Sequence, residues 1–302
     1  MTGVRITHGM MSDRLLNDVR RSNAEIARTS SQVTSQKRIQ TASDDAVGTG
    51  QALRTRTDLA EIDANIAGAQ TAAGWTGAAD TALGSLTDLI HRTRELVLQA
   101  GNDTLKASDR ASIAGELTQL KEQMKSIGNA KFGDAFIFAG QNSGTAPYTS
   151  GSDAYGGDAL PVTRMIGPGQ TVQVNVPGGT VLGGTPGDGK LLDTMNTAIA
   201  FLNGGTAADA NSLRTTTLTA LTTNLDQVVT ARSTLGATQN RVTLAESRLE
   251  DTKLLATGRL SEIEDADYAE SLVKLSTQQT AYQAALNAGA KVIQPSLMDF
   301  LR

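Results

Sequence analysis

The sequence contains no cysteine, which excludes disulfide bonds, thiolate metal sites and cysteine nucleophiles together. Histidine is almost as scarce, because the only two copies are His8 and His91, far apart in the chain. Most imidazole-based catalysis is therefore not expected. These two absences remove the commonest nucleophiles, general bases and metal ligands of enzymes.

Aromatic residues are also rare. They make up 3% of the 302 residues, with one Trp, four Tyr and five Phe, while hydrophobic residues of all kinds make up 39%. The core must then be built from Leu, Ile, Val and Ala, which suits helices packed along their lengths better than a compact enzyme core. The length suggests about two domains.

Long apolar runs and an excess of positive charge are missing as well. No stretch of 18 apolar residues occurs, so we expect no membrane partner. The net charge is −4, from 27 basic and 31 acidic residues, so nucleic acid is not an expected partner. The first residues lack the apolar stretch of a cleaved signal peptide, and export, if it occurs, is expected to use another route.

Glycine and proline gather in one part of the chain. Residues 133–205 hold 16 of the 30 glycines and five of the six prolines. Inside this part, Val172, Val174 and Val176 alternate with polar residues after a Gly-Pro-Gly turn at 167–169, which predicts a β-hairpin. Residues 136–138 (Phe-Ile-Phe) are a further strand candidate. We expect one insert with turns and strands in a mostly helical protein.

The helical periodicity is clearest after the insert. A seven-residue step gives Leu221, Val228, Leu235, Val242, Leu249, Ala256 and Ile263. The parallel series that starts at Leu218 turns polar in its middle. This pattern predicts a helix of about 70 Å that lies against other helices in coiled-coil manner.

A second long series precedes the insert and comprises Ile62, Ala69, Thr76, Leu83, Ile90 and Val97. Its helix is expected to begin at residues 43–45 (Ser-Asp-Asp), with Ser43 as the cap. A third helix is expected to open at Ser108 and to carry an apolar stripe from Ile113 to Ile127.

Both chain ends carry thinner apolar stripes. At the N-terminal end they are Leu15, Val19, Ile26 and Val33, and at the C-terminal end Leu272, Leu275, Tyr282, Leu286, Ile293 and Leu297. A helix with so little apolar area per turn is rarely stable in water without a packing partner. We expect these ten residues to form an assembly and partner interface, packed on each other or on neighbouring copies.

These patterns predict a mainly α fold, a long antiparallel helical bundle or coiled coil built from both chain ends with a small β-rich insert. The expected segments are an N-terminal helix at 1–42, two halves of a helical rod at 43–132 and 191–262, the Gly/Pro-rich β insert at 133–190, and a C-terminal helix at 263–302.

Two motifs suggest chemistry but have simpler readings. Residues 184–190 (Gly-Thr-Pro-Gly-Asp-Gly-Lys) have the spacing of a phosphate-binding loop, yet Leu191 follows where Ser or Thr would hold Mg²⁺. A flexible connection into a helix that begins near Leu191 explains the glycines equally well. The acidic run at 262–267 lacks the glycine of a calcium loop and is expected to be a solvated junction between two helices. We expect no enzyme activity, cofactor or metal.

Two single residues are assigned to packing. His91, between Ile90 and Arg92, is expected at the surface or in helix packing. Trp75 lies among small residues at 72–78 and is expected to fill the hollow that they leave.

Several stretches together resemble the flagellin superfamily of bacterial flagellar axial proteins. They are residues 5–7 (Arg-Ile-Thr) with Met10 and Met11, 37–39 with 43–46, the turn at 102–110, and 263–268 (Ile-Glu-Asp-Ala-Asp-Tyr) with 278–281. The pieces cover some two-thirds of the chain in the right order. Ala42 and Ala46 depart from the pattern, because the superfamily often has prolines there.

Within the superfamily, the chain looks most like the type 3 hook-associated proteins of the hook–filament junction. The discriminating stretches are 136–140 (Phe-Ile-Phe-Ala-Gly) and 145–148 (Thr-Ala-Pro-Tyr). The resemblance implies terminal helices that pair as a coiled coil and stack on other copies in a ring. It also implies hook-associated and filament-side neighbours, an export chaperone at the C-terminal region, and an extracellular place in the flagellum after type III export.

Three other functions stay open at this point. The chain could be flagellin, the bulk filament subunit, an enzyme that uses the loop at 184–190, or a cytoplasmic coiled-coil scaffold. Self-assembly into long polymers would favour flagellin, and nucleotide binding that depends on Lys190 would favour an enzyme. Absence from sheared flagella would favour a cytoplasmic scaffold.

Overall fold

The computed structural model describes residues 8–102 and 105–293 and divides into two compact units. One unit is 61–252, and the other combines 1–60 with 253–302. In order along the described chain, the helices are α1 (His8–Ser35), α2 (Ala46–Ala100), α3 (Ala107–Gly128), α4 (Gly178–Val181), α5 (Leu191–Gly204), α6 (Ala207–Ser212), the π-helical turn η1 (Leu213–Thr217), α7 (Leu218–Glu264) and α8 (Tyr268–Ile293).

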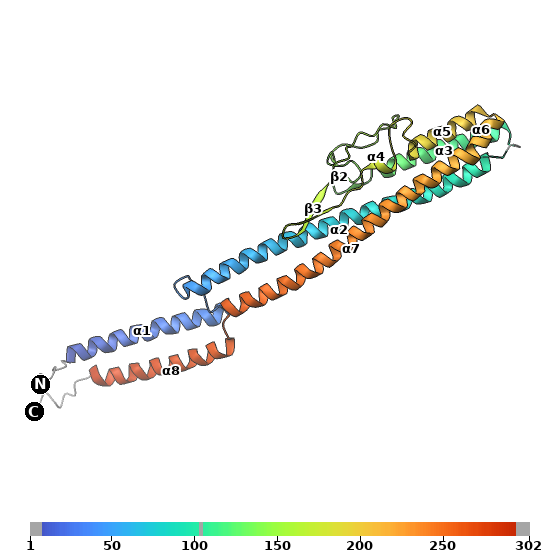
Figure 1. The fold of residues 1–302 in the computed structure, drawn as a ribbon. Helices are drawn as coiled ribbons and strands as arrows, with labels where there is room; N and C mark the ends of the chain where they lie inside the picture. Colours follow the sequence, from blue (N-terminus) through green and yellow to red (C-terminus); the bar gives the residue numbers. More distant parts are fainter. Residues whose placement is uncertain (1–7, 103–104, 294–302) are drawn as a thin grey trace, which may run out of the picture. The chain divides into compact units, whose positions relative to one another are not determined.

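Within residues 61–252, α2 and α7 run side by side in opposite directions (Figure 1). Their apolar series face the core as the heptad spacing predicts: Leu83, Ile90 and Val97 are at most 1% exposed, and Leu221 and Val228 are completely buried. Where the second series of α7 turns polar, Arg232 reaches across to Asp80 on α2, with Nε and Oδ1 2.9 Å apart. Arg232, the first polar residue of that series, therefore links the two helices.

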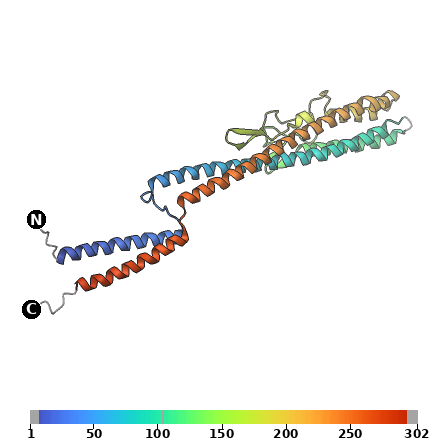
Figure 2. The ribbon, with the colours of Figure 1, turned by 60° about the horizontal axis from the view of Figure 1, so that its bottom comes forward.

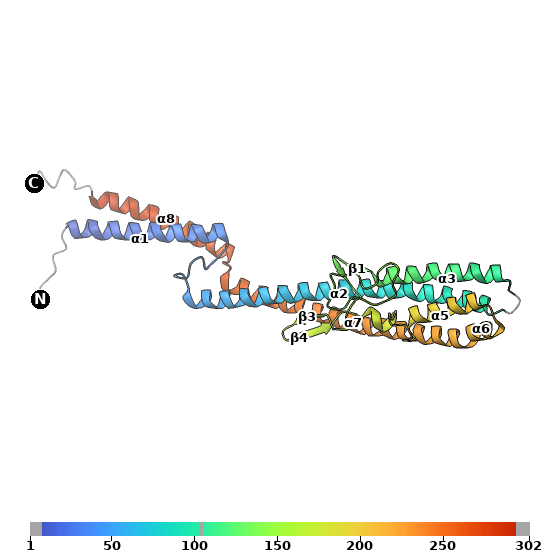
Figure 3. The same cartoon turned by 90° about the horizontal axis from the view of Figure 1, so that it is seen from above.

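Helices α3 and α5 complete the core of this unit, and Figure 3 shows α3 beside α2. The stripe predicted for α3 is confirmed, because Ile113, Leu117 and Met124 are buried. Helix α5 begins at Leu191, as expected from the sequence, and Leu191 and Met195 are fully buried. The result is a helical bundle with Leu, Ile, Val and Ala at its centre.

The insert and the two residues before it contribute four short strands. Strands β3 (Thr163–Gly167) and β4 (Gln170–Gln173) pair antiparallel across the Gly-Pro-Gly turn, so the predicted hairpin is confirmed. Strands β1 (Lys131–Phe132) and β2 (Ala135–Phe136) form a second small pair. The strand expected at 136–138 is wrong beyond Phe136, because Ile137 and Phe138 leave the ladder to fill the core.

A buried charge cluster fixes the insert to the helices. The ammonium group of Lys125 on α3, only 4% exposed, lies 3.3 Å from the Asp153 carboxylate of the insert. Lys121 Nζ and Asn196 Nδ2 each contact the same carboxylate at 2.9 Å. Because every charge in this cluster has a partner, α3, the insert and α5 are joined without an unpaired buried ion.

Trp75 packs as the sequence predicts. Its ring is 3% exposed and meets Phe132 edge to face, with the ring centroids 6.1 Å apart. The neighbouring Gly74 leaves the space for Phe132, since a Cβ there would lie 2.6 Å from the ring. The Arg164 guanidinium lies 5.7 Å from the Trp75 ring centroid, which adds a cation–π contact.

The start of α2 differs from the sequence prediction. The capping residue is Asp45, whose Oδ1 accepts the Gly48 N–H at 2.8 Å, and not Ser43. Asp44 is used instead to hold the preceding turn, because its Oδ2 accepts the N–H groups of Gln40 and Thr41. With three candidate caps in a row, the sequence alone does not fix the cap within one or two residues.

The hairpin lies directly on α2 at Gly68, where a Cβ would be 2.3 Å from the Met165 carbonyl oxygen. We expect Gly68→Ala to destabilise residues 61–252 by about 1–3 kcal/mol, because the β3 backbone must move away. Gly77→Ala, on the same helix with nothing within 4 Å, should instead stabilise by about 0.5–1 kcal/mol. Urea unfolding followed by Trp75 fluorescence measures both, and equal signs would contradict the prediction.

Within residues 8–102 and 105–293, none of the helices has an apolar stretch of the length and hydropathy that crossing a bilayer requires.

Candidate assembly interface

The N-terminal helix α1 presents one seam to α8. Apart from Gln32, its described partly or fully buried positions follow steps of three and four residues along Leu15, Val19, Ser22, Ile26, Thr29 and Val33. All four apolar residues predicted for the interface are in this seam, and each is half-buried. Thr29 is the most buried of the six, at 3% exposure. This is the spacing of a coiled-coil seam with polar residues at two of six positions.

The facing seam of α8 follows the same spacing along Ser271, Leu275, Gln278, Tyr282, Ala285 and Gly289. Of the C-terminal residues expected at the interface, Leu275 and Tyr282 lie in this seam. Leu272 and Leu286 do not, since they are 47% and 45% exposed and face away from α1. Ile293 is the last residue of α8, with no described side-chain surroundings, and Leu297 lies outside the described residues.

Two contacts define the register between these helices, which lie side by side in Figure 2. The Ala266 N–H donates to the Gln36 carbonyl at one end. At the other end, a Cβ at Gly289 would be 2.5 Å from Leu15 Cδ2. The pair is therefore antiparallel. Both seams continue from Leu15 and Gly289 in steps of three and four residues.

From this register we infer the layers Leu15 with Gly289, Val19 with Ala285, Ser22 with Tyr282, Ile26 with Gln278, Thr29 with Leu275, and Val33 with Ser271.

Outside the seam, the same unit exposes large apolar side chains. On the paired helices these are Met10, Met11, Leu16, Leu272, Val273 and Leu286, between 43% and 67% exposed. Four more lie on the parts of α2 and α7 that belong to this unit, namely Val47, Leu53, Leu254 and Leu255, between 64% and 75% exposed. Sequence reasoning missed the last four, although Leu254 and Leu255 are apolar residues that the heptad series does not use.

The acidic run at 262–267 is a junction between α7 and α8, as predicted, but it is not fully solvated. Glu264 is only 4% exposed, and its Oε2 lies 2.7 Å from the Arg56 guanidinium and 3.0 Å from Lys37 Nζ. Burial opposes the charge of Glu264, yet hydrogen bonds from Lys37 and Arg56 outweigh it and lower the pKa of this carboxyl. No group of three or more metal-binding side chains occurs in the described part of the chain.

The glycine-rich loop at 184–190 has its amide groups already occupied. The Asp188 carboxylate accepts the N–H groups of Gly184, Thr185 and Lys190, at 2.8–3.1 Å. The Asp193 carboxylate accepts those of Gly187 and Gly189. A phosphate would have to displace two anions that belong to the chain, so this geometry argues against nucleotide binding.

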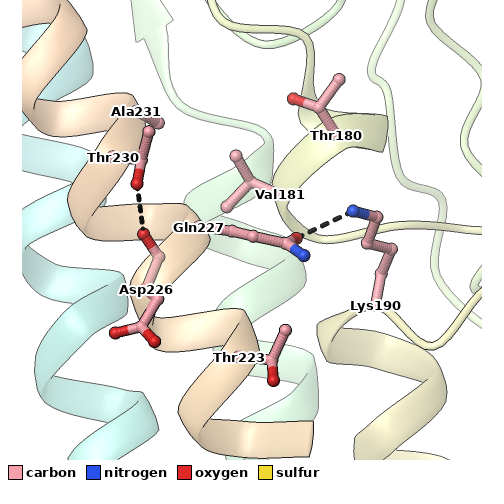
Figure 4. A pocket seen from close by; sticks show the side chains of 8 residues that line it. All are labelled: Thr180, Val181, Lys190, Thr223, Asp226, Gln227, Thr230 and Ala231. Carbon is pink, nitrogen blue, oxygen red and sulfur yellow. Dashed lines mark hydrogen bonds between the residues drawn. The ribbon is translucent and has the colours of Figure 1, made fainter.

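Lys190 does not point into that loop. Its ammonium group donates to Gln227 Oε1 on α7 at 2.8 Å, as Figure 4 shows. The surrounding depression has a volume of about 530 Å³ and is open to solvent, with Thr223, Asp226 and Thr230 along its α7 side. It holds no pair of acid and base groups at bonding distance. His91 is exposed on α2, as expected.

The two stretches that carried the closest resemblance form the centre of the insert. Ile137, Phe138 and Ala139 are at most 2% exposed, and Tyr148 is equally buried. The Tyr148 hydroxyl donates to the Gly183 carbonyl at 2.7 Å, and burial raises the pKa of this phenol. The Asn129 side chain bonds both the carbonyl and the N–H of Tyr148. These residues are structural.

Comparison with known proteins places both ends of the chain in one family. Residues 6–143 match the N-terminal helical region of bacterial flagellin, and residues 218–301 match its C-terminal helical region. The chain belongs to the flagellin family. The unmatched residues between these regions contain the β3–β4 hairpin, α4, α5, α6 and η1.

Individual relatives of this flagellin-family chain are similar over almost its whole length. Flagellar hook-associated protein 3 of Salmonella typhimurium is 25% identical, and the match covers 93% of this chain and 95% of the relative. Flagellin of Bacillus subtilis is 26% identical, with 99% and 100% covered, but it is the weaker match of the two. A solved structure, a putative flagellar hook-associated protein from Vibrio parahaemolyticus, has a TM-score of 0.67 at 20% identity, covering 74% of this chain and all of that one.

Proposed function

We propose that this chain is a structural subunit of the bacterial flagellum that connects the hook to the filament. The observation that carries the proposal is the full-length similarity to flagellar hook-associated protein 3, together with the signature stretches at 136–140 and 145–148. Family membership supports self-assembly and contact with hook and filament proteins. The role is mechanical, and the filled amide loop at 184–190 gives no support to a catalytic one.

The helix pair α1–α8 supplies the packing unit. The seam residues of α1 and α8 pack against each other within one chain, whereas Met10, Leu16, Leu272 and Leu286 remain exposed around the seam. Apolar surface that one copy leaves uncovered is removed from water when copies stack, at about 25 cal/mol per Å². We infer that these off-seam residues contact neighbouring subunits, and that the seam residues hold the pair together so that it can be stacked.

Two finer points belong to the same proposal. Copies are expected to form a closed ring between the neighbouring hook-associated protein and the filament. Before assembly, an export chaperone is expected to cover the C-terminal region, where Leu272, Val273 and Leu286 give it exposed apolar surface on α8. The seam residues Leu275 and Tyr282 would become available to it only if α8 separated from α1.

The test is a chain that lacks roughly the first and last 40 residues. We expect it to keep the fold of residues 61–252, because that unit has its own core, and to fail to support filaments on hooks. Circular dichroism and Trp75 fluorescence measure the fold, and electron microscopy of a complemented deletion strain measures assembly. Unfolding of residues 61–252 after trimming either end would contradict the proposal.

The second candidate is flagellin itself, favoured by the match to the Bacillus subtilis protein along its entire length. The two functions differ in what the deletion strain does. Loss of a junction protein leaves hooks and releases filament subunits into the medium, whereas loss of flagellin removes those subunits. Purified protein that grows into long polymers without other components would favour flagellin.

A further inference from the structure

The end of α1 and the α7–α8 corner are tied together by backbone hydrogen bonds. Gln36 adopts a left-handed conformation with φ of 58°, which turns the chain out of α1. The N–H groups of Arg38 and Ile39 then donate to the Glu264 carbonyl, and the Ala266 N–H donates to Gln36. Two segments more than 200 residues apart in sequence thus meet where α7 ends.

Side chains reinforce this meeting point through one carboxylate. Glu264 accepts hydrogen bonds from Lys37, which follows α1, and from Arg56, on α2. Lys37 Nζ also lies 3.1 Å from Asp265 Oδ1. The side chain of Glu264 therefore links the end of α1, helix α2 and the end of α7.

The neighbouring charges are balanced around this link. Arg38 donates to the Ile263 carbonyl at 2.7 Å and pairs with Asp45, and Arg28 pairs with Asp44 at 2.8 Å. Of the eight charged side chains in this network, Glu264 is the most buried, at 5% side-chain exposure, whereas those of Lys37 and Arg56 are 41% and 59% exposed. Water can solvate the two cations but not the carboxylate.

We propose that Glu264 acts as a clamp that holds the α1–α8 pair to the ends of α2 and α7. Because Glu264 is buried and its two cationic partners are exposed, removing the cations and removing the carboxylate charge have different costs. Loss of both cations leaves a buried anion without a partner, which is costly. Loss of the charge on Glu264 leaves two cations that water can solvate, which costs less. This inference goes beyond the proposed function, because it concerns the isolated chain.

The asymmetry gives a test in which one substitution repairs another. In the full chain, we expect Lys37→Gln with Arg56→Gln to speed hydrogen exchange at the amides of Arg38, Ile39 and Ala266 by about tenfold or more. Adding Glu264→Gln to that double variant should slow exchange again, because the stranded charge is gone. Exchange in residues 61–252 should not change in any of these variants.

Glu262→Gln is the matched control, since Glu262 is an exposed glutamate two residues before the clamp. It should leave exchange at the three amides unaltered. Faster exchange in the triple variant than in the double variant would overturn the proposal, and so would equal acceleration throughout 61–252. Because the measurement uses isolated protein, its failure is distinguishable from a failure to assemble on the hook.

Discussion

Replacing Gly289 by leucine is expected to separate α1 from α8 and to leave hooks without filaments. A Cβ at this position would lie 2.5 Å from Leu15 Cδ2 and 3.3 Å from Leu15 Cγ, so the facing leucine has to move. Overfilling a packed layer costs about 1–3 kcal/mol. That is a large share of what such a seam supplies, because Ser22, Thr29 and Gln278 add little apolar area to it.

Hydrogen exchange of the isolated protein measures the separation, and complementation of a deletion strain measures the loss of filaments. We expect exchange throughout α1 and α8 to accelerate while residues 61–252 keep their protection, since they form a separate compact unit. Gly258→Leu is the control on α7 in the same unit. A Cβ there has nothing within 4 Å, so the isolated chain should gain slightly in helix stability.

A second substitution tests the register itself. In the variant with both Gly289→Leu and Leu15→Ala, the large side chain has been moved from α1 to α8 within one layer. Most of the protection should return, because the summed volume of the layer is again close to the original. If Gly289→Leu alone left exchange unaltered, or if Leu15→Ala deepened its effect, the antiparallel register would be wrong.

The sequence predicts the rod of this protein well because heptad spacing determines which residues are buried in a long helix. Leu221, Val228 and Leu235 had to face a partner whatever that partner was, and α2 supplies it. The same reasoning found the half-buried residues of α1. It did not separate Leu272 and Leu286 from the seam of α8, because Ser271, Gln278 and Gly289 occupy seam positions and the apolar residues alone do not mark the seam.

Features that depend on distant partners could not be predicted. Glu264 reads as one acid in a solvated run until Arg56, 208 residues earlier in the chain, is placed beside it. The loop at 184–190 resembles a phosphate site until Asp188 and Asp193 are seen to occupy its amides. In both cases the sequence shows the charge of each residue, but it does not show which oppositely charged or hydrogen-bonding group the fold places beside it.

The stretch at 136–140 ends in Gly140, and the surroundings of this residue require a glycine. Gly140→Ala is expected to destabilise residues 61–252 by roughly 3 kcal/mol or more. Its φ is 72°, in the left-handed region, and a Cβ would lie 2.4 Å from the Asp158 carbonyl oxygen. Asp158 cannot retreat easily, because its carboxylate accepts the N–H groups of Gln141, Asn142 and Leu160. The Asp158 N–H also donates to the Ala139 carbonyl at 3.0 Å.

Gly133→Ala separates the two causes of this loss. Gly133 has a similar φ of 60°, but nothing lies within 4 Å of the position of its Cβ. Gly133→Ala should therefore lower the free energy of unfolding only by the cost of placing alanine in the left-handed conformation, about 1–2 kcal/mol. Urea unfolding followed by the fluorescence of the single tryptophan, Trp75, gives both free energies of unfolding. Equal losses in the two variants would mean that backbone conformation alone demands glycine, and that the contact between Gly140 and Asp158 contributes nothing to the stability of the insert.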